Sequence, residues 1–105
     1  MVKIEFNVNE GYNLSVSGHT GAEEKGKDIV CAGVSILFYT LCASLKERES
    51  ALEKLMCNEE DGNGNIICVP KAEWKNTIEC IFWTVLNGFE LLANEYPDYV
   101  SFECK

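Results

Sequence analysis

The sequence predicts an α+β fold in which two helices pack on one mixed, mostly antiparallel sheet, in the order β-β-α-β-β-α-β. Two pairs of strand-like segments, each pair separated by a turn sequence, indicate two hairpins. A longer segment with apolar residues at helical spacing follows each hairpin. With 105 residues the chain is long enough for one hydrophobic core, so we expect a single domain over residues 1–105.

The first hairpin is predicted by apolar and polar residues that alternate over residues 2–8 and again over residues 12–17. A period of two is typical of a strand with one buried face. Between the two runs, Asn9-Glu10-Gly11 predicts a turn. The second strand therefore leads to Gly18 and His19, which we expect at an edge of the sheet.

The first helix is predicted from Asp28 to Leu45, before a charged segment at residues 46–49. Asp28 is a favourable N-cap residue, and this start makes Cys31 about the third helical residue. Helix N-termini stabilise negative charge, so a thiol there is favoured as the thiolate. Three small residues come after Cys31: Ala32, Gly33 and Ser35. Their size suits either close helix packing or room for a bound chain.

The first strand of the second hairpin is not decided by its own sequence, because residues 50–58 fit either a helical or a strand period. The following sequence Asp61-Gly62-Asn63-Gly64 predicts a hairpin turn, and residues 65–69 form a β-rich run closed by Pro70. A hairpin needs two strands. We therefore expect the first of them to run from Glu53 to Glu59.

A second helix is predicted from Asn76, which with Glu79 resembles a capping box, to a position before Pro97. A final strand is expected from Tyr99 to Glu103, where apolar and polar residues alternate again. Two tryptophans suit the rim of the core or a dimer contact, with substrate contact as the alternative: Trp74 and Trp83.

The charge of the chain limits its partners. Seventeen acidic residues against nine basic ones give a net charge of −8. This charge opposes direct binding to nucleic acid and favours a basic protein or peptide. No apolar stretch was found to reach the ~20 residues that a membrane-spanning helix needs, so we expect a soluble protein.

The six cysteines show no paired spacing and no CxxC sequence, and most of them stand in apolar runs. They are expected to be small core residues in a reducing cytoplasm rather than disulfide partners. The chain has a single histidine and no close cysteine pair, so the sequence implies no metal site and no cofactor.

Cys31 is an exception to the expectation that the cysteines are small core residues. His19 is joined to Cys31 by a polar segment that contains Gly21 and Gly26 and follows Gly18, and these glycines allow a turn that brings the two residues together. A thiol beside an imidazole is a candidate nucleophile with its base. The alternative is a small core cysteine and an exposed histidine with no shared role.

At these residues the sequence resembles a known family. GHTG followed by GKDIVCAGVS resembles the signature of the ribosomal-processing cysteine proteases, in which a GHxG histidine and a DxVC cysteine form the catalytic pair. The resemblance implies a homodimeric endopeptidase. It removes a short N-terminal extension from a large-subunit ribosomal protein, after an apolar segment that contains phenylalanine. Thr20 and Gly33 depart from the family pattern, where alanine is common.

The resemblance assigns Cys31 as the attacking thiolate, His19 as general base and acid, and Asp28 as a residue that helps orient the site. Ser35, one turn beyond Cys31, either hydrogen bonds near the pair or bonds to its own helix. The remaining residues expected at the loop or beside substrate are Gly18, Gly21, Gly26, Ala32 and Gly33. Two other functions stay open, a non-catalytic ribosome-associated binding module and a thiol redox sensor.

Overall fold

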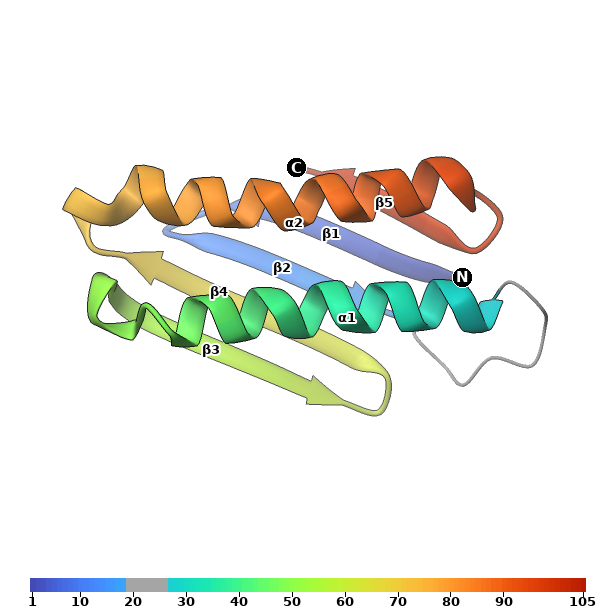
Figure 1. Cartoon of the computed structure of the whole chain (residues 1–105), viewed down its shortest axis with the longest axis horizontal. Helices are drawn as coiled ribbons and strands as arrows, with labels where there is room; N and C mark the ends of the chain where they lie inside the picture. Colours follow the sequence, from blue (N-terminus) through green and yellow to red (C-terminus); the bar gives the residue numbers. More distant parts are fainter. Residues whose placement is uncertain (19–26) are drawn as a thin grey trace.

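The computed structural model describes residues 1–18 and 27–105, without the side chains of residues 27 and 28. The elements follow in the predicted order (Figure 1). They are β1 (Val2–Val8), β2 (Tyr12–Ser17), α1 (Lys27–Lys46), β3 (Leu52–Glu60), β4 (Asn63–Pro70), α2 (Lys75–Glu95) and β5 (Val100–Cys104). Short 3-10 turns at Glu49–Ala51 and Ala72–Trp74 precede β3 and α2.

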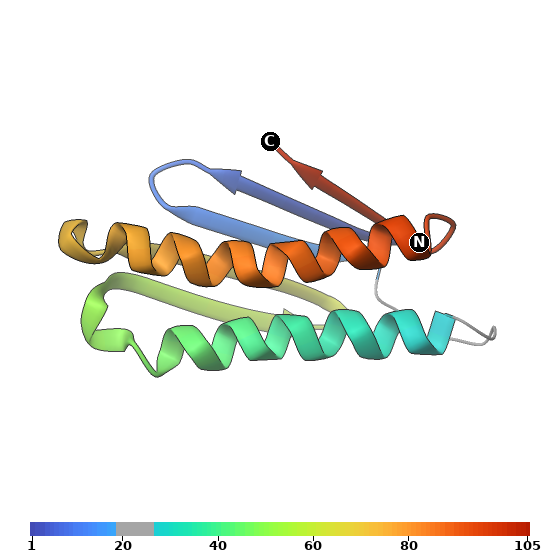
Figure 2. The same cartoon turned by 45° about the horizontal axis from the view of Figure 1, so that its top comes forward.

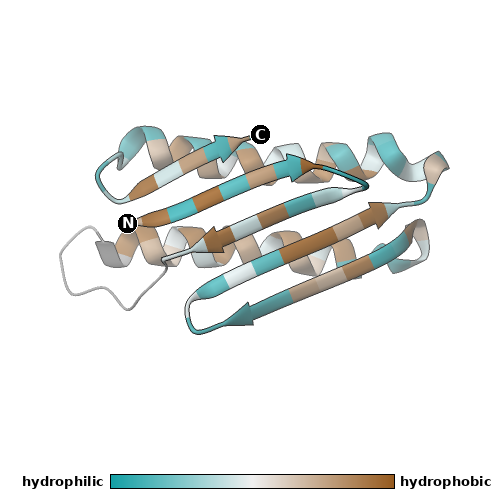
Figure 3. Cartoon of the chain, turned by 180° about the vertical axis from the view of Figure 1, so that it is seen from behind, coloured by the Kyte–Doolittle hydropathy of each residue, from teal (hydrophilic) through white to brown (hydrophobic). Residues whose placement is uncertain are grey.

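The five strands form one sheet in the order β3-β4-β2-β1-β5. β5 runs parallel to β1, and the other neighbouring strands are antiparallel. α1 and α2 lie side by side on the same face of this sheet (Figures 1 and 2). Among the described residues no helix lies over the opposite face, and along β1 hydrophobic and hydrophilic residues alternate (Figure 3). The predicted two-helix sandwich is therefore confirmed.

The second hairpin forms as predicted, with β3 as a strand. Its turn has two residues with positive φ, Asp61 at 51° and Gly62 at 78°. Such a pair closes a tight hairpin whose twist matches that of its strands. An irregularity in register between Leu52 and Lys54 marks the start of β3. Tertiary pairing with β4 thus decides between the helix and the strand that the sequence of residues 50–58 allowed.

The predicted N-cap of the first helix is wrong, and the helix begins two residues earlier than that cap implies. α1 begins at Lys27, so Asp28 is its second residue rather than its N-cap, and Cys31 is its fifth residue rather than about its third. A carboxylate is favourable throughout the first turn as well as at the cap, so residue type alone does not fix the boundary. Cys31 thus follows the first four N–H groups, the ones that lack a partner within the helix.

The predicted capping box of the second helix is also absent. α2 begins at Lys75 after Trp74, and this N-cap residue makes no side-chain capping bond. Asn76 is therefore inside the helix. Glu79 instead accepts a hydrogen bond from the hydroxyl of Tyr12 at 3.0 Å. The Glu79 carboxylate therefore bonds to β2, whereas a capping box would require it to bond to a backbone N–H at the start of the helix.

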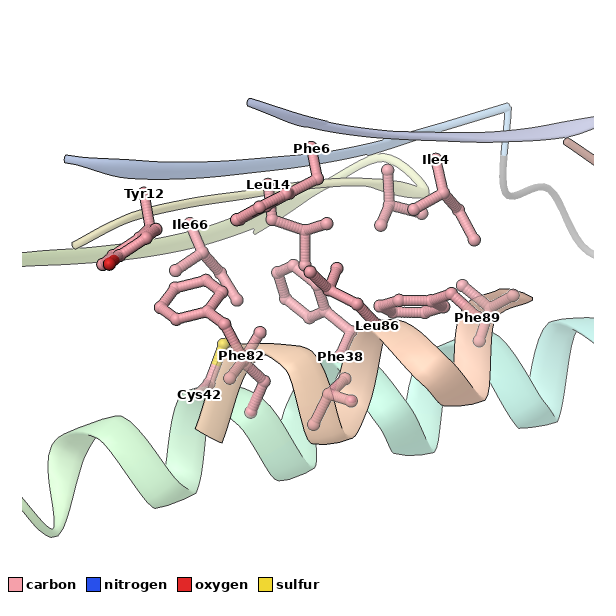
Figure 4. Packing of buried hydrophobic residues seen from close by; sticks show 14 of the residues in the cluster. Ile4, Phe6, Tyr12, Leu14, Phe38, Cys42, Ile66, Phe82, Leu86 and Phe89 are labelled. Carbon is pink, nitrogen blue, oxygen red and sulfur yellow. The ribbon is translucent and has the colours of Figure 1, made fainter. Parts of the chain in front are cut away.

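The core fills the space between the helices and the sheet (Figure 4). Its largest fully buried side chains include Phe82, Phe89 and Leu86 of α2, Leu41 and Leu45 of α1, and Ile4, Leu14 and Ile66 of the sheet. Each such side chain contributes about 1.5–3 kcal/mol on leaving water. No polar or charged residue is buried among those whose exposure the structure describes.

The expectation that no apolar stretch is long enough to cross a membrane is wrong when helices are judged by length and composition alone. The 18 residues Ile29–Lys46 of α1 are long and apolar enough. In this fold α1 covers the sheet, with Val30, Val34 and Leu45 essentially inaccessible to solvent. A helix that covers a core has the same composition as a spanning helix, which accounts for its apolar sequence.

Candidate active site

Cys31 lies half-buried near the start of α1. Ser35 follows one turn later, and it is also half-buried, whereas Ala32 is exposed. Residues four apart lie on the same side of a helix, so Cys31 and Ser35 share one face. His19, Gly21 and Gly26 lie outside the described residues, as does the side chain of Asp28.

Gly18 is held in a conformation that only glycine adopts readily. Its φ is 75°, and a Cβ at this position would lie 2.4 Å from the carbonyl oxygen of Met1. Its N–H donates a hydrogen bond to Oδ1 of Asn63 at 3.2 Å. The end of β2, from which the chain continues to residue 19, therefore lies against Met1 and is bonded to β4.

Gly33 packs α1 against α2. A Cβ on Gly33 would lie 3.2 Å and 3.3 Å from the two terminal methyl groups of Leu92. This contact favours the close packing of helices over a role in lining a bound chain. Ala32 is exposed, and its place beside substrate stays a prediction.

A small hollow lies between α1 and the β3–β4 hairpin, and Ser35 is one of its lining residues. Tyr39 donates a hydrogen bond from its hydroxyl to Glu59 at 2.5 Å, which joins α1 to β3. This bond, followed by burial, raises the pKa of Tyr39. The residues that line the hollow are Val16, Val34, Ser35, Phe38, Tyr39, Glu59, Gly62, Asn63 and Gly64.

Three other thiols are held in their neutral form. Burial, and next a hydrogen bond with Cys57, raises the pKa of Cys42 to about 12. Burial likewise raises the pKa of Cys68 to about 11, with the nearby Cys57 as the smaller cause. The pKa of Cys104 is also raised, mainly by burial. Because the thiolate is the nucleophile, these cysteines are poor candidates for covalent chemistry.

The remaining predicted side chains have simpler surroundings. Trp83 contacts the ring of Phe6 edge-on, with 5.9 Å between ring centroids, so it covers the rim of the core as expected. Trp74 is 46% exposed. Within residues 1–18 and 27–105, no group of three or more His, Cys, Asp or Glu residues is placed to hold a metal ion.

Sequence reasoning missed three residues of this region, Tyr39, Glu59 and Asn63. Their contacts join positions 20 and 45 residues apart in the chain, and no local pattern reports them. The turn sequence around Gly62 indicated the hairpin. It did not indicate that the hairpin would meet both α1 and the end of β2.

Comparison with known protein families identifies the family of this chain. The family model of the cysteine protease Prp matches residues 1–101. The chain belongs to this family. Membership in the Prp family makes it a cysteine protease, an enzyme that hydrolyses peptide bonds by way of a thiol.

Solved structures agree with the Prp fold over the whole chain. A crystal structure of a protein from Streptococcus mutans is 28% identical with a TM-score of 0.77, over 99% of this chain and 93% of that one. The ribosomal processing protease Prp of Staphylococcus aureus, in complex with a substrate peptide, is 21% identical with a TM-score of 0.81, over 100% of both chains. The same protease with a covalently linked product peptide is 23% identical, with a TM-score of 0.79 over 100% of both chains. No curated protein matches the sequence.

Proposed function

We propose that this Prp-family protease is an endopeptidase that removes the short N-terminal extension of a large-subunit ribosomal protein. Cys31 would be its nucleophile and His19 its general base and acid. One observation carries the proposal: Val16, near the end of β2, lines the same hollow as Val34 and Ser35 on the first turns of α1. The strand that leads to His19 and the helix that carries Cys31 therefore meet at one end of the fold (Figure 1).

The proposed reaction has two halves. The thiolate of Cys31 attacks the scissile carbonyl carbon, and the C–N bond breaks as His19 gives the former thiol proton to the leaving amine. Water, deprotonated by His19, then hydrolyses the thioester and restores the thiol. N–H groups at the start of α1 would stabilise the oxyanion, and Asp28 in the same turn would help orient the site.

The substrate proposal rests on charge and on the relatives. The Staphylococcus aureus protease is described as ribosomal processing, with a substrate peptide bound. A net charge of −8 on this chain suits a basic ribosomal protein, since opposite charges speed encounter. We further propose that the enzyme acts in the cytoplasm as a homodimer. Exposed apolar side chains support a dimer surface, among them Ile29 and Ile36 on α1 and Leu91 on α2.

The test is cleavage of the ribosomal protein precursor from the same organism, with mass determination of both products. We expect one cut after an apolar, phenylalanine-containing segment. Cys31→Ala and His19→Ala should each abolish it, and Cys80→Ala, which changes an exposed thiol elsewhere, should not. Cleavage that survives Cys31→Ala, or an intact precursor with the unmodified enzyme, would refute the proposal.

A further inference from the structure

Asn63 joins the β3–β4 hairpin to the end of β2. It is the first residue of β4, directly after the Asp61-Gly62 turn. The register between β2 and β4 ends at Val16 and Gly64. Beyond that last pair, Oδ1 of Asn63 accepts the hydrogen bond from the N–H of Gly18 at 3.2 Å. A side chain thus continues the attachment of β2 to β4 where the backbone ladder stops.

The hairpin that carries Asn63 is also held against α1. A Cβ on Gly64 would lie 2.7 Å from two ring atoms of Phe38, so the ring rests directly on the backbone of β4. Glu59, the cross-strand partner of Gly64, accepts the hydrogen bond from Tyr39. Phe38 and Tyr39 stand about two turns beyond Cys31 on the same helix.

These contacts give the hairpin two attachments. One is to α1, which carries Cys31, through Glu59 and Gly64. The other is to the residue that precedes His19 in the chain, through Asn63. A side chain at position 18 is excluded, because a Cβ there would lie 2.4 Å from the carbonyl oxygen of Met1.

We propose that Asn63 is a positioning residue for the catalytic pair. By holding the N–H of Gly18 it fixes the direction in which the chain leaves β2 for His19, relative to the helix that carries Cys31. The inference rests on the proposed function of these two residues. Asn63 touches no reacting atom in this scheme, so its loss lowers the rate of the chemical step more than the affinity for substrate.

Three substitutions at Asn63 separate this role from others. Asn63→Ala and Asn63→Leu remove the acceptor, whereas Asn63→Asp keeps an acceptor oxygen of the same reach. The matched control is Asn65→Ala. Asn65 is an exposed asparagine two residues along the same strand, in register with Ser15 and Asn58.

The measurement is kcat and KM for cleavage of the precursor. A small misplacement of a catalytic group costs up to about a hundredfold in rate, so we expect kcat to fall about tenfold or more in Asn63→Ala and Asn63→Leu, with KM within about twofold. Asn63→Asp should retain about half of the parent kcat or more, because hydrogen bonds to charged acceptors are at least as strong. Asn65→Ala should match the parent.

Four results would overturn the inference. One is an unchanged kcat in Asn63→Ala and Asn63→Leu, and another is a rise in KM alone, which would make Asn63 a substrate contact. The third is an equal loss in Asn63→Asp and Asn63→Leu. The fourth is a loss of kcat that tracks a lower folded fraction than in Asn65→Ala. Cleavage that survives His19→Ala refutes the proposed function instead, and it is measured separately from the Asn63 variants.

Discussion

Tyr12 and Glu79, 67 residues apart in the chain, are joined by a hydrogen bond of 3.0 Å between the phenol and a carboxylate oxygen. The bond ties β2 to the second turn of α2 at the rim of the core, where the ring of Tyr12 packs on Phe82 with 5.1 Å between centroids. Burial, followed by the bond to Glu79, raises the pKa of Tyr12 to about 12. Two predictions depend on this pair.

Tyr12→Phe should lower the free energy of unfolding by about 1 kcal/mol at neutral pH, because it removes one hydrogen bond and keeps the ring. Urea unfolding of the two proteins measures the difference. Glu79→Gln, which keeps an acceptor oxygen, should be closer to the parent than Tyr12→Phe. Equal stability of Tyr12→Phe and the parent would show that the bond contributes nothing.

The same pair predicts a dependence on alkaline pH. The folded pKa of Tyr12 lies above the usual value near 10, so folding favours the neutral phenol. Its contribution is fully present below about pH 10 and is lost as the pH rises through about 12. Unfolding measured across this window should show a steeper loss for the parent than for Tyr12→Phe. Parallel curves would contradict the assignment of the shift to the folded state.

Native-state alkylation should distinguish the cysteines. Cys42 and Cys68, whose pKa values are raised to about 12 and about 11, should resist brief iodoacetamide treatment at about pH 8. Cys31, as the proposed nucleophile, should be labelled ahead of the other five. Peptide mapping gives the order, and labelling in urea, where all six should react alike, is the control. Early labelling of Cys42 would place the reactive thiol elsewhere.

Gly64→Ala should lower stability by about 1–3 kcal/mol, the usual range for overpacking, because its Cβ would lie 2.7 Å from the ring of Phe38. Phe38→Leu alone leaves a cavity. Combined with Gly64→Ala it should cost less than the sum of the two, and thermal unfolding of the four proteins in this cycle measures the coupling. Strict additivity would mean that the ring and the strand do not compete for space.

The order of elements could be predicted because alternation and helical spacing are local properties of the sequence. The placement of Cys31 and Ser35 on one face of the first helix could be predicted the same way, since a spacing of four residues is also local, and their roles stay predictions. The caps at Asp28 and Asn76 were wrong because the residue types that favour a cap are also tolerated in the first turn. The hydrogen bond between Gly18 and Asn63 joins residues 45 positions apart in the chain, and no local pattern encodes such a contact.

The parallel pairing of β5 with β1 sets the order in which the sheet can be completed. β1 is synthesised before β5, yet the neighbour on its outer side consists of residues Val100–Cys104. Until those residues leave the ribosome, one row of N–H and C=O groups on β1 has no β5 beside it, and such an edge is a template for pairing with another chain. β5 therefore protects β1 from misassembly during synthesis.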